Sequence, residues 1–210
     1  MSLHDDRKEY RANSLSDEAK SADPVALFSE WLESYRQTGV ADATAFALST
    51  VSSDGHPDAR IVLLKALEQG RMQFFTHYTS KKGRDLAANP FAHALFFWPS
   101  QERQVRVFGP VSRVDSAWST QYFNSRPAES RRGAIASDQS APIESRAALD
   151  GQFQALQATP DAALQRPEGW GGYALEIQRI EFWQGRPSRM HDRLVFTKQD
   201  AAWHVQRLQP

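Results

Sequence analysis

The chain has 210 residues, a formal net charge of zero and 40% hydrophobic residues. These values are typical of a globular domain that is long enough to bury its own core. The balanced charge argues against a general nucleic-acid-binding surface, because such domains are usually clearly basic. The absence of cysteine excludes disulfides, thiolate metal sites and a cysteine nucleophile. Since there is no signal-peptide pattern and no apolar run of ~18 residues, we expect a cytoplasmic protein that does not enter a membrane.

The first 22 residues carry many charges and few apolar side chains. Such a segment is expected to be flexible when it stands alone. Arg7, Lys8, Tyr10 and Arg11 form a small basic and aromatic cluster within it. Two interpretations are open: a solvated tail, or a segment that orders over a bound anion.

A helix is predicted to begin at Asp23-Pro24, because Asp is a good N-cap and Pro fits the first helical position. Its apolar stripe runs to Tyr35, and Gly39 can end it. Asp54-Gly55 predicts a tight hairpin turn. Further helices are predicted from Ser80 to before Pro90, over 115–125 and over 143–157. Strands are predicted over 46–51, 60–65, 72–76, 92–98, 104–108, 111–114, 173–177, 180–182, 194–197 and 203–208.

The order of these elements indicates the fold class. Strands do not alternate regularly with helices, so a doubly wound parallel sheet is not expected. The alternation shifts phase between 177 and 180, which predicts a β-bulge. The pattern favours a mainly β protein of the α+β class, with an antiparallel, closed or partly closed β-barrel and helices around it.

The sequence lacks the motifs of several common classes of binding and catalytic site. No GxGxxG, GxxxxGK[ST] or GxSxG sequence is present, and the six histidines show no metal-ligand spacing. Cations instead gather beside predicted strands and helix starts, at Arg60, Lys65, Lys81-Lys82, 126–132 and 189–193. Lys and Arg at such positions suit phosphate monoesters. Spacing alone leaves ordinary surface charge as an equal alternative to two phosphate sites.

Seven stretches in the same order resemble the pyridoxine (pyridoxamine) 5'-phosphate oxidase family. They are Arg60-Ile-Val-Leu-Leu-Lys65, Phe75-Thr76 with Ser80-Lys81-Lys82, Glu102-Arg103-Gln104-Val105, Tyr122-Phe-Asn-Ser-Arg-Pro127, Gln139-Ser140, Ile180-Glu-Phe-Trp-Gln-Gly185 and Arg189-Met-His-Asp-Arg193. The ending Arg207-Leu-Gln-Pro210 also matches, with Gln209 where the family usually has Ala. Two further departures are Ile135 in place of Trp and Phe75 in place of Tyr.

The resemblance implies an FMN-binding split β-barrel over residues 23–210 that forms a homodimer with FMN at the interface. It implies that residues 1–22 close over the active site. Its FMN contacts fall on Arg60, Ile61, Lys65, Phe75, Thr76, Lys81, Lys82, Gln104, Gln139, Ser140, Trp183 and Arg193. Its substrate contacts fall on Arg7, Tyr10, Lys65, Tyr122, Arg126, Ser130, Arg189 and His191.

The implied reaction is the oxidation of pyridoxamine 5'-phosphate or pyridoxine 5'-phosphate by O2 to pyridoxal 5'-phosphate, with release of H2O2. The amine substrate also releases ammonia. Because the flavin supplies the redox chemistry, the protein must mainly bind, orient and polarise. Arg189 and His191 are the expected catalytic residues: a planar guanidinium can lie against the pyridine ring, and an imidazole can move a proton. No metal or nucleic acid is expected.

Two alternatives remain. Related split-barrel flavin oxidases act on phenazine precursors that carry no 5'-phosphate, and the combination of Lys65, Tyr122, Arg126 and Ser130 argues against such a substrate. A flavin- or pyridoxal-phosphate-binding protein without activity is the other, and the presence of Arg189 and His191 argues against it.

Overall fold

A computed structural model describes His4 and residues 9–210. Arg7, an expected substrate contact, lies outside the described residues. The helices are α1 (Pro24–Arg36), α2 (Lys81–Ala88), α3 (Ser116–Ser125), α4 (Ala128–Ala136) and α5 (Arg146–Gln154). The strands are β1 (Ala45–Val51), β2 (Pro57–Leu63), β3 (Ala66–Glu68), β4 (Arg71–His77), β5 (Phe91–Trp98), β6 (Arg103–Arg113), β7 (Trp170–Glu176), β8 (Arg179–Gln184), β9 (Asp192–Gln199) and β10 (Ala202–Leu208).

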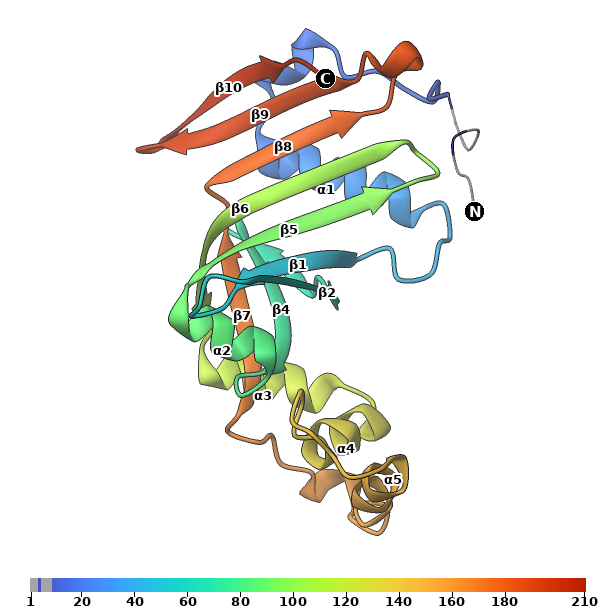
Figure 1. Cartoon of the computed structure of the whole chain (residues 1–210), viewed down its shortest axis with the longest axis vertical. Coiled ribbons are helices and arrows are strands. Elements are labelled where there is room, and N and C mark those ends of the chain that lie inside the picture. Colours follow the sequence, from blue (N-terminus) through green and yellow to red (C-terminus); the bar gives the residue numbers. More distant parts are fainter. Residues whose placement is uncertain (1–3, 5–8) are drawn as a thin grey trace.

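The strands form one curled antiparallel sheet, which confirms the expected mainly β, split-barrel architecture. Its main path runs β10-β9-β8-β6-β5-β1-β2, and β7, β4 and β3 branch from β6. Figure 1 shows α1 behind the broad part of the sheet, while α3, α4 and α5 gather at the end of the molecule away from β9 and β10.

The sheet curls because β6 takes part in both of its branches. Residues 103–108 of β6 pair with β8, and Val111 to Arg113 pair with β7. At the bend between these stretches, a Cβ on Gly109 would lie 1.7 Å from the carbonyl oxygen of Glu176. Only glycine permits this close approach of two backbones. The two strands predicted at 104–108 and 111–114 are therefore one bent strand.

A second strand change lies at residues 177 and 178. β7 pairs with β4 and β6, whereas β8 pairs with β6 and β9. The phase shift that predicted a bulge is thus the point where the chain leaves one branch of the sheet for the other. The reason is tertiary, since the amide of Gln178 donates to the carbonyl of Phe108 across the fold.

The core lies between α1 and the inner face of the sheet. Phe28 packs edge-on against Phe96 with ring centroids 5.0 Å apart, and Trp31 packs against Phe182 at 5.2 Å. Each fully buried aromatic side chain contributes about 1.5–3 kcal/mol of transfer free energy. This burial fixes the sheet whose strands carry the functional residues.

Most of the predicted elements are present. Asp23 caps α1 by accepting the amides of Val25 and Ala26, Ser80 caps α2, and Asp115 caps α3. The hairpin at Asp54-Gly55 joins β1 and β2, and the terminal hairpin is β9–β10. β3 and α4 were not predicted from the sequence, and α5 is shorter at both ends than the helix predicted over 143–157. In the described part of the chain, no helix combines the length and the apolar composition needed to cross a bilayer.

Candidate active site

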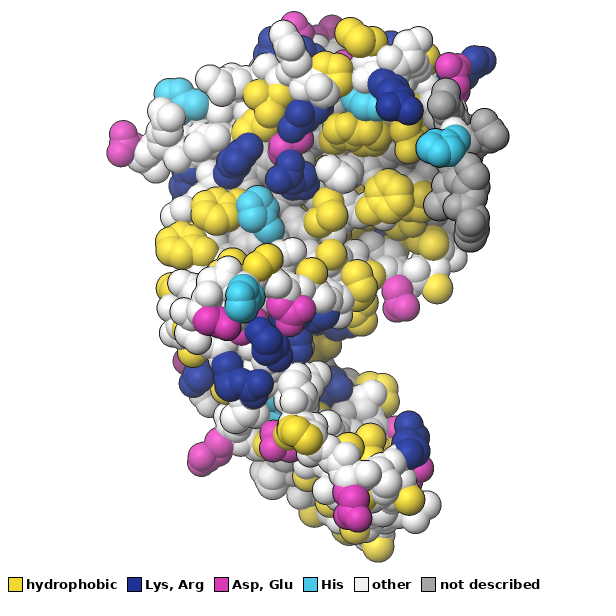
Figure 2. Space-filling view, viewed as in Figure 1, with side chains coloured by type: hydrophobic (Ala, Val, Ile, Leu, Met, Phe, Trp, Pro, Cys, Tyr) yellow, Lys and Arg dark blue, Asp and Glu magenta, His cyan; other side chains and the backbone are white. Residues whose placement is uncertain are grey.

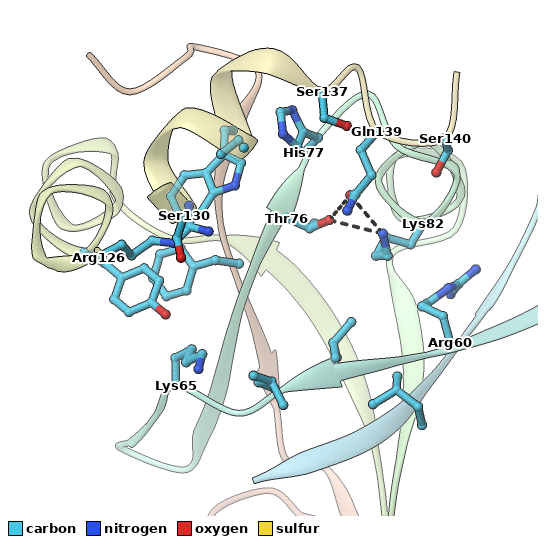
Figure 3. A pocket seen from close by; sticks show the side chains of 18 of the residues that line it. Arg60, Lys65, Thr76, His77, Lys82, Arg126, Ser130, Ser137, Gln139 and Ser140 are labelled. Carbon is cyan, nitrogen blue, oxygen red and sulfur yellow. Dashed lines mark hydrogen bonds between the residues drawn. The ribbon is translucent and has the colours of Figure 1, made fainter. Parts of the chain in front are cut away.

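A cavity of about 830 Å³ opens between the sheet and the helical end of the molecule. Pockets for small ligands and cofactors usually measure ~300–1,000 Å³. Eleven of the predicted site residues line it: Arg60, Ile61, Lys65, Phe75, Thr76, Lys82, Tyr122, Arg126, Ser130, Gln139 and Ser140. They come from β2, β4, α2, α3, α4, the α3–α4 connection and the loops after β2 and α4, so the fold assembles this group from distant parts of the sequence (Figure 3).

One end of the cavity is built around Lys82, in the first turn of α2. Its side chain is only 7% exposed, and its Nζ lies 3.2 Å from the Thr76 hydroxyl. Gln139 Oε1 accepts hydrogen bonds from Lys82 Nζ at 3.1 Å and from Thr76 Oγ1 at 2.6 Å. Burial, and then the nearby charge of Arg60, lower the pKa of Lys82. Among the described residues, this ammonium forms no ion pair with a carboxylate, so an anionic ligand would offset its desolvation.

Arg60 lies at the same end, where its side chain is held by one residue of β2 and one of the neighbouring β1. Its guanidinium donates to Thr50 Oγ1 at 2.7 Å and to Asp58 at 2.6 Å. Lys81, another predicted FMN contact, pairs through its side chain with Asp85 at 2.9 Å and is not among the residues that line the cavity. The cationic group at this end therefore consists of Lys82 and Arg60.

The other end is aromatic and cationic. Phe75 stacks on Tyr122 with ring centroids 3.9 Å apart and on Trp170 at 5.5 Å. The guanidinium carbon of Arg126 lies 4.9 Å from the Trp170 ring centroid. Its Nη1 is buried without a hydrogen-bond partner among the described residues, and burial lowers its pKa. Figure 3 shows Lys65, Arg126 and Ser130 on this side, across the cavity from Lys82 and Arg60.

The other predicted residues that the structure describes, apart from Lys81, form a second group on and beside the outer face of β6, β8 and β9: Tyr10, Gln104, Trp183, Arg189, His191 and Arg193. Gln104, Trp183 and Arg193 are direct neighbours across these strands. The His191 ring centroid lies 4.6 Å from that of Trp183 and 5.7 Å from that of Tyr10. Within one chain, no member of this second group lines the cavity.

His191 and Arg189 are held by a tight turn. His191 Nδ1 accepts the backbone N–H of Arg186 at 3.1 Å, which leaves Nε2 to carry the proton of the neutral ring. Burial, and then the charge of Arg189, lower the pKa of His191. Ser188 and Arg189 both have left-handed backbone, with φ of 56° and 60°. Non-glycine residues rarely adopt this conformation, and it often marks a functional segment.

Several residues that line the cavity were not predicted from the sequence, above all His77 and Trp170. They face each other across the β4–β7 pair, where Phe75 is opposite Gly172. A Cβ on Gly172 would lie 2.8 Å from the Phe75 ring, so this glycine makes room for the stack. Gly171-Gly172 was a usable signal of such an approach. The pairing of His77 with Trp170 has no local signal, because it depends on strand register.

The comparisons with known proteins identify one family. Residues 33–163 match the family model described as pyridoxamine 5'-phosphate oxidase, and residues 170–210 match that of the pyridoxine 5'-phosphate oxidase C-terminal dimerisation region. A pyridoxine/pyridoxamine 5'-phosphate oxidase of Herminiimonas arsenicoxydans is 47% identical over all of both chains. One of Pseudomonas paraeruginosa is also 47% identical, over 100% of this chain and 99% of the relative.

Two solved structures share the fold. PhzG from Burkholderia lata, in complex with tetrahydrophenazine-1-carboxylic acid, has a TM-score of 0.89 and 29% identity over 95% of this chain and 99% of its own. A pyridoxamine 5'-phosphate oxidase-related, FMN-binding protein from Nostoc punctiforme has a TM-score of 0.73 and 17% identity over 91% of this chain and all of its own. From the two matching family models and the full-length relatives, we conclude that this chain belongs to the pyridoxine/pyridoxamine 5'-phosphate oxidase family.

Proposed function

We propose that this protein is an FMN-dependent oxidase that converts pyridoxamine 5'-phosphate and pyridoxine 5'-phosphate to pyridoxal 5'-phosphate with O2. H2O2 is the second product, and the amine also yields ammonia. The observation that carries the proposal is a single cavity with cations at two opposite ends: Lys82 and Arg60 at one, Arg126 and Lys65 at the other (Figure 3). Such a cavity suits a phosphate-bearing cofactor and a phosphate-bearing substrate together.

The residues at the Lys82 end fit the phosphate of FMN. A buried ammonium lies here in the first turn of α2, so its charge and the N-terminus of the helix both favour an anion. Gln139 and Ser140 close this end from the loop after α4. Bound FMN would take two electrons from the substrate and pass them to O2, which is chemistry that protein side chains do not provide.

The Arg126 end fits the substrate phosphate. The unpartnered Nη1 of Arg126, the Tyr122 hydroxyl, Ser130 and Lys65 provide charge-assisted and neutral donors there. Binding energy from a phosphate remote from the reacting carbon helps to hold that carbon in a reactive position. This set also separates the proposal from a phenazine-type substrate, which carries no phosphate for these donors to bind.

A homodimer would complete the site. The second group, with Gln104, Trp183, Arg193, Arg189 and His191, lies outside the cavity of its own chain. The exposed sheet face beside it carries Ile61, Phe91 and Phe97, which are 67%, 48% and 57% exposed. Figure 2 shows apolar side chains gathered over this sheet. Large exposed apolar patches usually mark interaction sites, and the C-terminal region matches a family dimerisation region.

In that dimer, the partner's second group would face the cavity. A guanidinium such as that of Arg189 can lie flat on the pyridine ring of the substrate. The Nε2–H of neutral His191 can donate a hydrogen bond to the ring oxygen of the substrate, and the imidazole can assist proton movement at the reacting carbon. Trp183 offers a flat apolar contact and Arg193 a charged contact to the cofactor.

Absorption spectroscopy of the purified protein tests the proposal. The FMN-loaded protein should show flavin bands that bleach without oxygen when pyridoxamine 5'-phosphate is added. Admission of air should restore the bands and yield the 4'-aldehyde and peroxide. Tight flavin binding without bleaching would favour a binding protein without activity. Bleaching by a reduced phenazine precursor, and not by pyridoxamine 5'-phosphate, would favour the PhzG-like alternative.

A further inference from the structure

The chain before α1 is docked on the sheet end that carries the second group of site residues. Arg186 donates from Nη1 to the carbonyl of Asn13, and the Leu15 amide donates to Asp192 at 3.0 Å. Arg207 donates to the Leu15 carbonyl at 2.8 Å, and the Leu15 side chain is buried in the core. Residues 9–17 thus form a strap, which we call the N-terminal strap.

Glu102 contacts this strap directly after Tyr10. Its carboxylate Oε2 accepts the amide of Arg11 at 2.7 Å and the amide of Ala12 at 2.8 Å. Glu102 is only 6% exposed and has a left-handed backbone, with φ of 55°. Its own carbonyl accepts the amide of Gly185 at 2.8 Å, which ties it to the end of β8.

This arrangement sets the position of Tyr10, the residue that precedes the two amides. The Tyr10 ring centroid lies 5.6 Å from that of Trp183 and 5.7 Å from that of His191, both edge-on. A Cβ on Gly185 would lie 2.7 Å from the Tyr10 ring, so glycine is needed for the ring to lie there. Two consecutive backbone amides on one buried carboxylate leave the adjacent side chain little freedom.

We infer that Glu102 is the docking point of the N-terminal strap and therefore a positioning residue that holds Tyr10 against Trp183 and His191. A carboxylate suits this task because hydrogen bonds to a charged acceptor are roughly twice as strong as neutral ones. The expected effect on turnover rests on the proposed function. The docking itself does not, because it can be measured without flavin or substrate.

The first experiment measures hydrogen exchange of the Arg11 and Ala12 amides, together with trypsin cleavage after Arg11. In Glu102→Gln, we expect these amides to exchange roughly tenfold faster or more, since a charged acceptor is lost. The fragment that begins at Ala12 should also appear faster. The matched control is Glu176→Gln, whose carboxylate contacts the exposed Lys198 at 3.6 Å and lies away from the strap. Unchanged exchange in a folded Glu102→Gln protein would overturn the inference.

A second variant tests the same inference without a substitution at Glu102, in case Glu102→Gln does not fold. Gly185→Ala retains the Glu102 carboxylate chemically and puts a methyl group 2.7 Å from the Tyr10 ring and 3.1 Å from the Glu102 Cβ. We expect it to raise the KM for pyridoxamine 5'-phosphate severalfold with a smaller change in kcat, as Glu102→Gln and Tyr10→Ala should also do. Adding Tyr10→Ala to Glu102→Gln should then cause little further loss. Full additivity of the two changes would overturn the positioning role. If the wild-type protein were inactive, the proposed function would be wrong, but the hydrogen-exchange result would still test the docking of the strap.

Discussion

Glu181 holds Arg193 through two nitrogen atoms of the same guanidinium. Arg193 Nε and Nη2 each lie 2.8 Å from Glu181 Oε1, and Nη1 donates to the carbonyl of Gln209 at 3.0 Å. Glu181 is only 3% exposed, and Arg106 lies 3.4 Å from its other oxygen. The guanidinium predicted to contact FMN is thus fixed by the neighbouring strand and by the end of the chain.

Glu181→Gln should therefore weaken FMN binding by about tenfold, because a charged hydrogen bond contributes roughly 1.5–3 kcal/mol and its loss frees Arg193 to move. Flavin fluorescence titration measures the Kd. Glu176→Gln, which alters an exposed ion pair on the same sheet, serves as the control and should leave the Kd unchanged. Equal Kd values for the two variants would show that Arg193 needs no support from Glu181.

Lys82→Met should weaken FMN binding by about 30-fold or more while it leaves riboflavin binding almost unchanged, because Lys82 is assigned to the phosphate. Isothermal titration with both ligands checks this. Lys81→Met is the matched control: Lys81 is next in the chain, but it pairs with Asp85 outside the cavity lining. A larger loss for Lys81→Met than for Lys82→Met would reverse the assignment.

Arg126→Ala should raise the KM for pyridoxamine 5'-phosphate by ten- to 100-fold, since it removes a buried charged partner of the phosphate. The KM for unphosphorylated pyridoxamine should stay about the same, so the ratio of the two KM values is the diagnostic measurement. Arg146→Ala changes an exposed arginine paired with Asp150 and should affect neither KM. If both substrates lost affinity equally, Arg126 would support the fold of the site and not the phosphate.

The ligand-free protein should lose stability as the pH falls below about 6.5. Burial lowers the pKa of His77, with further effects from Asp138, which opposes the shift, and from Lys82 and Arg126. The folded state therefore binds a proton at His77 less readily than the unfolded state does. The contribution of His77 to the free energy of unfolding is complete above the pKa of the unfolded state and is lost as the pH falls towards the pKa of the folded state. The pKa values of His93 and His191 are shifted in the same direction.

His77→Asn should reduce the slope of this loss, as measured by urea unfolding between pH 5 and 7 in steps of about half a unit. His56→Asn, at an exposed position in the β1–β2 hairpin, is the control. An unchanged slope in His77→Asn would show that other groups govern the acid sensitivity.

Local chemistry explains which parts of the fold the sequence could predict. Helix starts at Asp23, Ser80 and Asp115 and the turn at Asp54-Gly55 depend on neighbouring residues, and each was predicted correctly. The continuity of β6 through Gly109 depends on a strand 67 positions later, at Glu176, so no local pattern reveals it.

In the candidate active site too, some features depend on local sequence and others on distant partners. The resemblance predicted which residue types matter, and the structure divides them into a cavity group and an outer group. Adjacent residues of a helix point in different directions, so Lys81 and Lys82 cannot both face the cavity. The sequence alone could not show that Lys82 turns inward while Lys81 turns to Asp85. The roles of Glu102 and Glu181 were also hidden, since their partners lie at positions 11, 12 and 193.

In the proposed homodimer, each active site combines the cavity of one chain with the Arg189–His191 group of its partner. Mixed dimers of Arg126→Ala and Arg189→Ala chains, co-expressed with two different tags, test it most directly. At a pyridoxamine 5'-phosphate concentration near the wild-type KM, each parent variant should be nearly inactive. The mixed dimer should have one site with both defects and one with neither, and it should recover about half of the wild-type activity, as the twofold symmetry of a dimer requires. A purified mixed dimer as inactive as its parents would contradict a shared site.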